Sequence, residues 1–213
     1  PGAGGERPAW RAVGNALEYE RDLPGDVHLL ARATLEGDGV RFHYELTNRS
    51  PVTYDMIYAV TDPRLTSIFH DERLERTYVH HADGFDLLAS ETPGRLTMPL
   101  GEWLPTRYLA SYRWPVPAQR EFRSDGIAHH YKSRKVDEPF IATLSTDRNW
   151  VVASFTREVG NVWSNPALTC QHVDPQSPLA PGGRAILEMK LLVLRGSLED
   201  ALRRERQQRP LLK

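Results

Sequence analysis

Histidines in a few short polar segments are the strongest candidates for chemistry in this chain. Two adjacent pairs, His80-His81 and His129-His130, and the single His172 lie in strand-like stretches. Imidazole is the side chain most often used as a metal ligand or as a proton carrier near neutral pH. Because successive side chains of a strand point to opposite faces, at most one histidine of each pair can face a shared site. We therefore expect about three imidazoles to converge.

A metal centre is one use of such a set. Asp174 follows His172 by two residues and would share its face if that strand continues. Histidines with a carboxylate suit zinc, iron or manganese, and calcium also takes carboxylate oxygens. The predicted ligands of this divalent ion are His81, His129, His172 and Asp174. No local metal motif such as HExxH is present, so the alternative is that these histidines cap turns or hydrogen-bond nearby backbone.

Proton transfer is the second use. Tyr131 follows His130, and Arg134 is close in sequence. These are the residue types of an eliminase, in which a histidine or tyrosine takes the proton α to a uronic carboxylate and an arginine or metal steadies the negative charge. The predicted catalytic residues are His129, His130, Tyr131 and His172.

Residues 90–135 break the strand pattern that surrounds them. Five prolines make long strands or helices unexpected there: Pro93, Pro99, Pro105, Pro115 and Pro117. Because the stretch is rich in aromatic residues, we expect an ordered loop excursion over one face of the domain. Arginines bind carboxylates bidentately, and flat aromatic rings stack on sugars. The predicted substrate-binding residues are Trp103, Arg107, Arg113 and Trp114. The alternative is that the aromatic rings anchor the excursion while its arginines stay solvated.

The elements that must position these residues follow a period of two. Val27–Leu35 and Val40–Leu46 alternate apolar and polar residues around Gly37-Asp38-Gly39, which predicts a β-hairpin with one buried face. A helix is expected over Leu198–Gln207, with Ser197 as its N-cap. Further strands are expected at Tyr54–Val60, Thr77–His81, Phe85–Ala89, Phe140–Thr146, Trp150–Glu158, Thr169–Val173 and Ala185–Leu194.

This pattern predicts an all-β fold, an antiparallel β-sandwich of the jelly-roll or supersandwich kind with a short C-terminal helix. Residues 1–26 are expected to be an irregular N-terminal segment, apart from a short strand near Ala16–Tyr19, and residues 27–213 a single domain.

Composition narrows the function classes. The formal charge of −1 argues against a nucleic-acid partner. The sequence contains no run of about 18 apolar residues, so a membrane span is not expected. Walker and dinucleotide glycine fingerprints are missing from the sequence, so no nucleotide cofactor is expected, and a GxSxG elbow is missing as well. The single Cys170 fits a cytosolic protein and equally an exported one without disulfides. A beginning without Met or an apolar leader resembles a mature end after signal removal and favours a secreted or periplasmic protein, with the cytoplasm also open. An oligomer is left open.

Two segments carry a resemblance to known domains. FHYELTNRSP resembles an early strand of bacterial β-sandwich domains, and HVDPQSPLAPGGRAILEMKLLVLRGSLEDALRR resembles the closing part of such domains in bacterial carbohydrate-active proteins. In those domains a Leu-x-Pro-Gly turn precedes a long final strand and a short helix.

The histidines, the excursion and this resemblance together predict a carbohydrate-active enzyme, either a polysaccharide lyase or a glycoside hydrolase. It is expected to act on an acidic poly- or oligosaccharide, and the histidines are the basis for expecting it to be metal-dependent. The alternatives are a non-catalytic carbohydrate-binding module and a β-sandwich domain that binds a protein partner.

Overall fold

The computed structural model describes residues 9–90, 107–111, 120–122, 128–131, 136, 138–157, 161–164 and 169–213. For 107–111, 120–122, 128–131 and 161 the description is limited to the backbone. Among the described residues, no helix has the length and apolar character that crossing a membrane requires.

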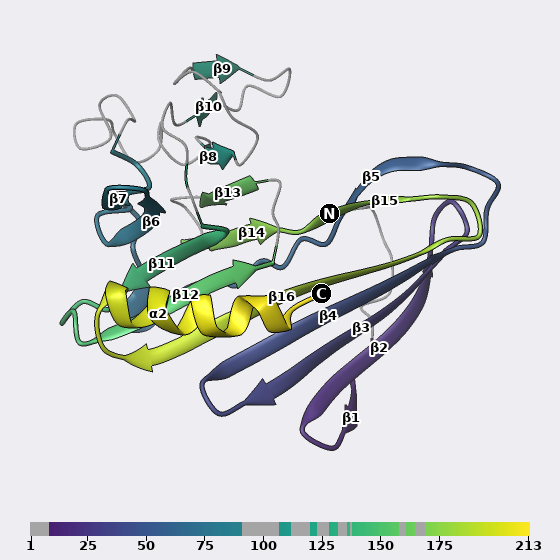
Figure 1. The fold of residues 1–213 in the computed structure, drawn as a ribbon, viewed down its shortest axis with the longest axis horizontal. Coiled ribbons are helices and arrows are strands. Elements are labelled where there is room, and N and C mark those ends of the chain that lie inside the picture. Colours follow the sequence, from purple (N-terminus) through teal and green to yellow (C-terminus); the bar gives the residue numbers. More distant parts are fainter. Residues whose placement is uncertain are drawn as a thin grey trace.

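A large antiparallel sheet forms the centre of the described structure (Figure 1). In spatial order its nine strands are β1 (Arg11–Val13), β2 (Ala16–Leu23), β3 (Val27–Glu36), β4 (Gly39–Asn48), β16 (Arg184–Arg195), β12 (Trp150–Thr156), β11 (Phe140–Leu144), β6 (Thr77–His81) and β7 (Gly84–Leu87). The predicted hairpin is confirmed as β3 and β4, whose register runs from Val27 opposite Asn48 to Glu36 opposite Gly39.

A smaller sheet packs on one face of the large one. Its strands, in order, are β14 (His172–Asp174), β13 (Asn161–Ser164), β8 (Arg107–Ser111), β10 (Ala128–Tyr131) and β9 (Arg120–Phe122). In this sheet β8 and β10 pair in parallel, and the other neighbouring strands pair antiparallel. A two-stranded ribbon, β5 (Tyr54–Tyr58) with β15 (Gln176–Leu179), covers the same face nearer to β16.

The prediction that residues 90–135 form a loop excursion is therefore corrected in part. Beyond Ser90, its described residues are the strands β8, β9 and β10, which extend the smaller sheet from β13. The physical reason is that prolines limit the length of a strand but not its pairing. The five-residue strand β8 fits between Pro105 and Pro115, and the shorter strands β9 and β10 follow Pro117.

The expectation of an irregular segment over residues 1–26 is also corrected. Residues 11–23 form β1 and β2, and β2 pairs with β3 along its whole length, from Ala16 opposite Thr34 to Leu23 opposite Val27. The short strand predicted near Ala16–Tyr19 is the first half of β2, and the rest of β2 was not predicted because both of its faces carry charged residues. Glu18 is nevertheless buried, since Arg32 on β3 donates to its carboxylate.

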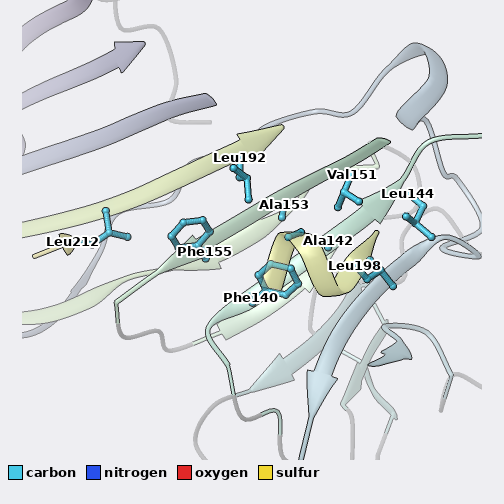
Figure 2. Close-up of a cluster of buried hydrophobic side chains, with 10 residues drawn as sticks. Phe140, Ala142, Leu144, Val151, Ala153, Phe155, Leu192, Leu198 and Leu212 are labelled. Carbon is cyan, nitrogen blue, oxygen red and sulfur yellow. The ribbon is translucent and has the colours of Figure 1, made fainter. Parts of the chain in front are cut away.

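The core is divided by the large sheet. On one side, α2 (Leu198–Gln208) packs over β11 and β12, where Phe140, Phe155 and Leu192 are fully buried (Figure 2). On the other side, Val162 and Val173 of the smaller sheet meet Ile141 and Met189 of the large one. Burial on both faces explains why β11 is apolar at nearly every position.

Local signals agree with the ends of the final helix. Ser197 is the N-cap: its hydroxyl accepts from the backbone N–H of Asp200, and the Asp200 carboxylate accepts from the backbone N–H of Ser197. This capping box satisfies two backbone donors that the first turn leaves open. A short 3₁₀ turn (Arg209–Leu211) follows, and another (Ser67–Phe69) precedes β6. The predicted antiparallel sandwich with a short C-terminal helix is confirmed.

Candidate functional site

The segment from Thr169 to Asp174 is fixed to the large sheet by a buried amide. Gln171 is fully buried, and its Nε2 donates to Thr143 Oγ1 at 2.9 Å and to the Val152 carbonyl at 3.1 Å. Its Oε1 accepts from Ser154 Oγ at 2.9 Å. Every polar atom of this amide that faces the sheet is therefore paired, which holds the backbone of the segment in one register.

Because side chains alternate along an extended segment, the reactive side chains lie on the face opposite Gln171. Val173 packs in the interlayer core, as Gln171 does, so Cys170, His172 and Asp174 point away from the large sheet. All three are nevertheless buried, with His172 3% exposed and Asp174 4% exposed.

A second segment, Thr61–Leu65, runs beside this one and adds Asp62. Arg64 forms an isolated bridge with Cys170, and the backbone N–H of Gln171 donates to the Pro63 carbonyl. Asp62 Oδ1 lies 3.2 Å from His172 Nε2, and the Asp62 side chain is 37% exposed. The group formed by Asp62, His172 and Asp174 therefore has a buried end at Asp174 and a solvent-facing end at Asp62.

The imidazole of His172 lies between two carboxylates. Its Nδ1 is 3.4 Å from Asp174 Oδ1, yet both atoms are buried without a hydrogen-bond partner among the described residues. The distance is within reach of a hydrogen bond, but the alignment is too poor to form one. Buried polar atoms that lack a hydrogen-bond partner are rare in folded proteins, and a functional role is one explanation for those that occur.

Trp163 holds this arrangement from the neighbouring strand. Its ring stacks on the His172 imidazole with centroids 3.8 Å apart and planes 6° apart, because Trp163 and His172 are directly paired in the β13–β14 register. Its Nε1–H donates to Asp174 Oδ2 at 2.8 Å. One side chain thus contacts both the imidazole and the buried carboxylate.

The predicted metal ligands are only partly brought together. In the part of the chain with described side chains, the potential ligands that lie within 4.8 Å of one another are Asp62, Cys170 and His172. Asp174 is in contact with His172 but is not a member of that group, and neither is His81. The sequence identified His172 and missed Asp62 and Cys170 as its neighbours.

The pair His80-His81 divides between the two faces, as expected for a strand. His80 packs edge-on against Phe85 with ring centroids 4.9 Å apart, on the side of α2. His81 follows the side of Val79, which lies in the interlayer core, and is 1% exposed. Of this pair, only His81 lies on the face that the smaller sheet covers.

The other predicted catalytic residues lie on β10 at backbone level. The register aligns Tyr131, Leu109, Trp163 and His172 in one row across the smaller sheet. Three steps of about 4.8 Å place the Tyr131 backbone about 14 Å from that of His172. His129 pairs with Arg107 and His130 with Tyr108, farther along the strand. The backbone alone therefore does not bring them next to His172.

The predicted sugar-binding set falls mostly beyond the described residues. Trp103, Arg113 and Trp114 lie outside them, and Arg107 is the first residue of β8, where only the backbone is described. Their roles stay predictions.

A separate polar surface occupies the opposite face of the large sheet. A hollow of 460 Å³ is lined there by β3, β4 and β16, with Arg41, His43 and Glu188 among its residues. Glu188 is 4% exposed. Burial alone would raise its pKa, but hydrogen bonds from His43, Arg41 and the Lys213 backbone outweigh burial and hold the pKa at about 2. The carboxylates that line this hollow are paired with neighbouring cations: Glu36 with Lys190, Glu45 with Arg184 and Glu188 with Arg41.

Comparison with known proteins identifies the fold. No family model matches the chain, and no curated protein matches it by sequence. Among solved structures, a candidate aldose 1-epimerase from Escherichia coli K12 superposes with a TM-score of 0.51 at 10% identity, covering 88% of this chain and 69% of its own. A galactose mutarotase related enzyme from Lactobacillus acidophilus gives a TM-score of 0.48 at 9% identity, with 88% and 71% covered.

A galactose mutarotase-like protein from Lactobacillus casei gives a TM-score of 0.47 at 10% identity, with 88% and 73% covered. At such low identity these likenesses concern the fold alone, and only the Escherichia coli structure superposes with a TM-score above 0.5 among the three. This chain shares the β-sandwich fold of that Escherichia coli structure.

Proposed function

We propose that this protein is an enzyme that acts on a carbohydrate at the group formed by Asp62, His172 and Asp174. The observation that carries the proposal is the buried imidazole between two carboxylates, with His172 Nδ1 and Asp174 Oδ1 3.4 Å apart and without a hydrogen-bond partner in the described part of the chain. The fold supports a sugar as the substrate, because the Escherichia coli structure with the same fold is named for epimerisation at C1 of an aldose.

The chemistry of that reaction class fits the residue types of this group. Exchange between the anomers of an aldose requires removal of the proton on the C1 hydroxyl and delivery of a proton to the ring oxygen, and the reverse steps close the ring again. A carboxylate can accept the first proton, and an imidazole, or a water molecule held beside it, can supply the second. Asp62 is the solvent-exposed member of the three residues, so the sugar would approach from its side.

The proposed reaction differs from the hydrolase or lyase reaction that was expected from the sequence. The expectation of a hydrolase or lyase for an acidic polysaccharide depended on Trp103, Arg113 and Trp114, which lie outside the described residues. The fold likeness supports a carbohydrate substrate but favours neither of those two reaction types. A uronic acid therefore enters the test as a second substrate beside neutral aldoses.

The test is exchange NMR of sugar anomers with the purified protein. Glucose, galactose and galacturonate would be compared, and we expect wild-type protein to accelerate anomer exchange for at least one of them. Asp174→Asn keeps an acceptor for the Trp163 indole but removes the charge, and it should lower the rate by about 10² or more.

The matched control is His28→Asn. His28 Nδ1 lies 2.9 Å from Asp22 Oδ1 at the β2–β3 pair, away from the site, so this variant removes another histidine–aspartate contact and should keep full activity. Exchange at the uncatalysed rate for all three sugars would overturn the proposal. Sugar binding without acceleration would instead indicate a non-catalytic binding module, which also contradicts it.

A further inference from the structure

We infer that Asp62, Cys170 and His172 form a binding site for a zinc-like divalent ion. Each residue offers one ligand atom, and the three atoms lie within 4.8 Å of one another. The site includes a thiol that the proposed proton chemistry does not use. Binding of the ion requires no sugar, so the inference goes beyond the proposed function and can fail separately from it.

The distance between the two hard ligands matches tetrahedral coordination. Zinc binds imidazole nitrogen and carboxylate oxygen at about 2.0–2.1 Å, so tetrahedral angles place these two atoms about 3.3 Å apart. The separation of His172 Nε2 and Asp62 Oδ1 is 3.2 Å. A thiolate at about 2.3 Å from the ion would be about 3.6 Å from either atom, which is inside the observed limit.

The carboxylate of Asp174 lies behind His172, on the side of the ring opposite the proposed ion. A histidine that binds metal through Nε2 usually donates its Nδ1–H to a carboxylate, which fixes the ring orientation. Asp174 Oδ1 lies 3.4 Å from His172 Nδ1, and both atoms are buried without a hydrogen bond among the described residues. Trp163 already holds the other oxygen of Asp174 and stacks on the ring, so the orientation is set.

The ligand types and exposure define the class of ion. A set of nitrogen, sulfur and oxygen ligands suits zinc, or cobalt in its place, and does not suit magnesium or calcium. Binding would release the Cys170 thiol proton to solvent as the thiolate forms. Three protein ligands leave a fourth position for water or a sugar oxygen.

Cobalt titration of the metal-free full chain tests this directly. We expect one Co²⁺ per chain with a near-ultraviolet thiolate-to-cobalt charge-transfer band, and competition by one equivalent of Zn²⁺. Cys170→Ala should abolish the band. Asp62→Asn, which changes an exposed side chain and spares the core, should weaken zinc binding at least 10-fold in chelator competition, and Asp174→Asn should weaken it by about 10- to 100-fold.

His70→Asn is the matched control, because His70 lies 3.3 Å from Thr169 Oγ1 but does not belong to the ligand group. It should leave cobalt binding unchanged. Absence of a charge-transfer band, or a band that persists in Cys170→Ala, would overturn the inference. If no ion binds while wild-type protein still accelerates anomer exchange, the metal site is refuted and the proposed function stands.

Discussion

Replacement of Glu188 by glutamine should destabilise this protein at neutral pH and have little effect in acid. Glu188 lies on β16 and is 4% exposed. Its Oε1 lies 2.7 Å from His43 Nδ1, and its Oε2 accepts from Arg41 at 2.6 Å and from the Lys213 backbone at 2.7 Å. These contacts favour the charged form more than burial disfavours it, and they lower the pKa from 4.5 to about 2.

The magnitude follows from linkage between proton binding and folding. A carboxyl group whose pKa is lower in the folded state contributes stability that is complete above its unfolded pKa and is lost as the pH falls to its folded pKa. The window here runs from about pH 4.5 down to about pH 2. With about 1.4 kcal/mol for each pKa unit, the contribution is at most on the order of 3 kcal/mol.

Urea unfolding of wild-type protein and Glu188→Gln between pH 2 and pH 7 measures this contribution. We expect the variant to be less stable by about 2–3 kcal/mol at pH 7 and the two stabilities to converge near pH 2. Glu45→Gln, which breaks the more exposed pair with Arg184 on the same face, is the control and should cost less than about 1 kcal/mol. A difference for Glu188→Gln that is constant over the whole pH range would refute the reasoning.

Three further substitutions test the fold, each by urea or thermal unfolding. Gly39→Ala should cost about 1–3 kcal/mol, because φ is +154° and an added Cβ would lie 1.9 Å from the Leu191 carbonyl oxygen, whereas Gly37→Ala has open space and should be neutral or slightly stabilising. Ser197→Ala should cost about 1 kcal/mol through loss of the helix cap, and an unchanged midpoint would contradict the capping role. Phe155→Ala should cost about 3–5 kcal/mol at a fully buried position, against less than about 0.5 kcal/mol for Leu35→Ala, which is 65% exposed.

The sheet could be predicted where one face is buried and the other is wet. The alternation from Val27 to Leu46 marks β3 and β4 because apolar residues on one face pack against the ribbon while charged residues on the other line the hollow. Of β2, the sequence predicted only the part near Ala16–Tyr19. The burial of Glu18 in this strand is acceptable only because Arg32 is paired with it. That pairing depends on a neighbouring strand and has no local signal.

The site could be predicted only where its residues are close in sequence. His172 and Asp174 were identified because two residues of one strand share a face. Asp62 could not be found in this way, because the bridge between Arg64 and Cys170 joins segments far apart in the chain. Trp163 was missed for the same reason, since its role follows from the pairing of β13 with β14. A tryptophan in a short strand-like run was the only sequence signal for it.

The indole N–H resonance of Trp163 gives the most direct test of a carbohydrate site at this group. This proton is donated to Asp174, and the ring stacks on His172, so a sugar bound there must change its surroundings. In a titration of ¹⁵N-labelled protein with the sugars used for anomer exchange, with the resonance assigned by Trp163→Phe, we expect the Trp163 signal to shift in a saturable way. The signals of Trp10 and Trp150, which are exposed elsewhere on the large sheet and its edge, should stay unchanged. A saturable shift of Trp10 or Trp150 with none at Trp163 would contradict the account.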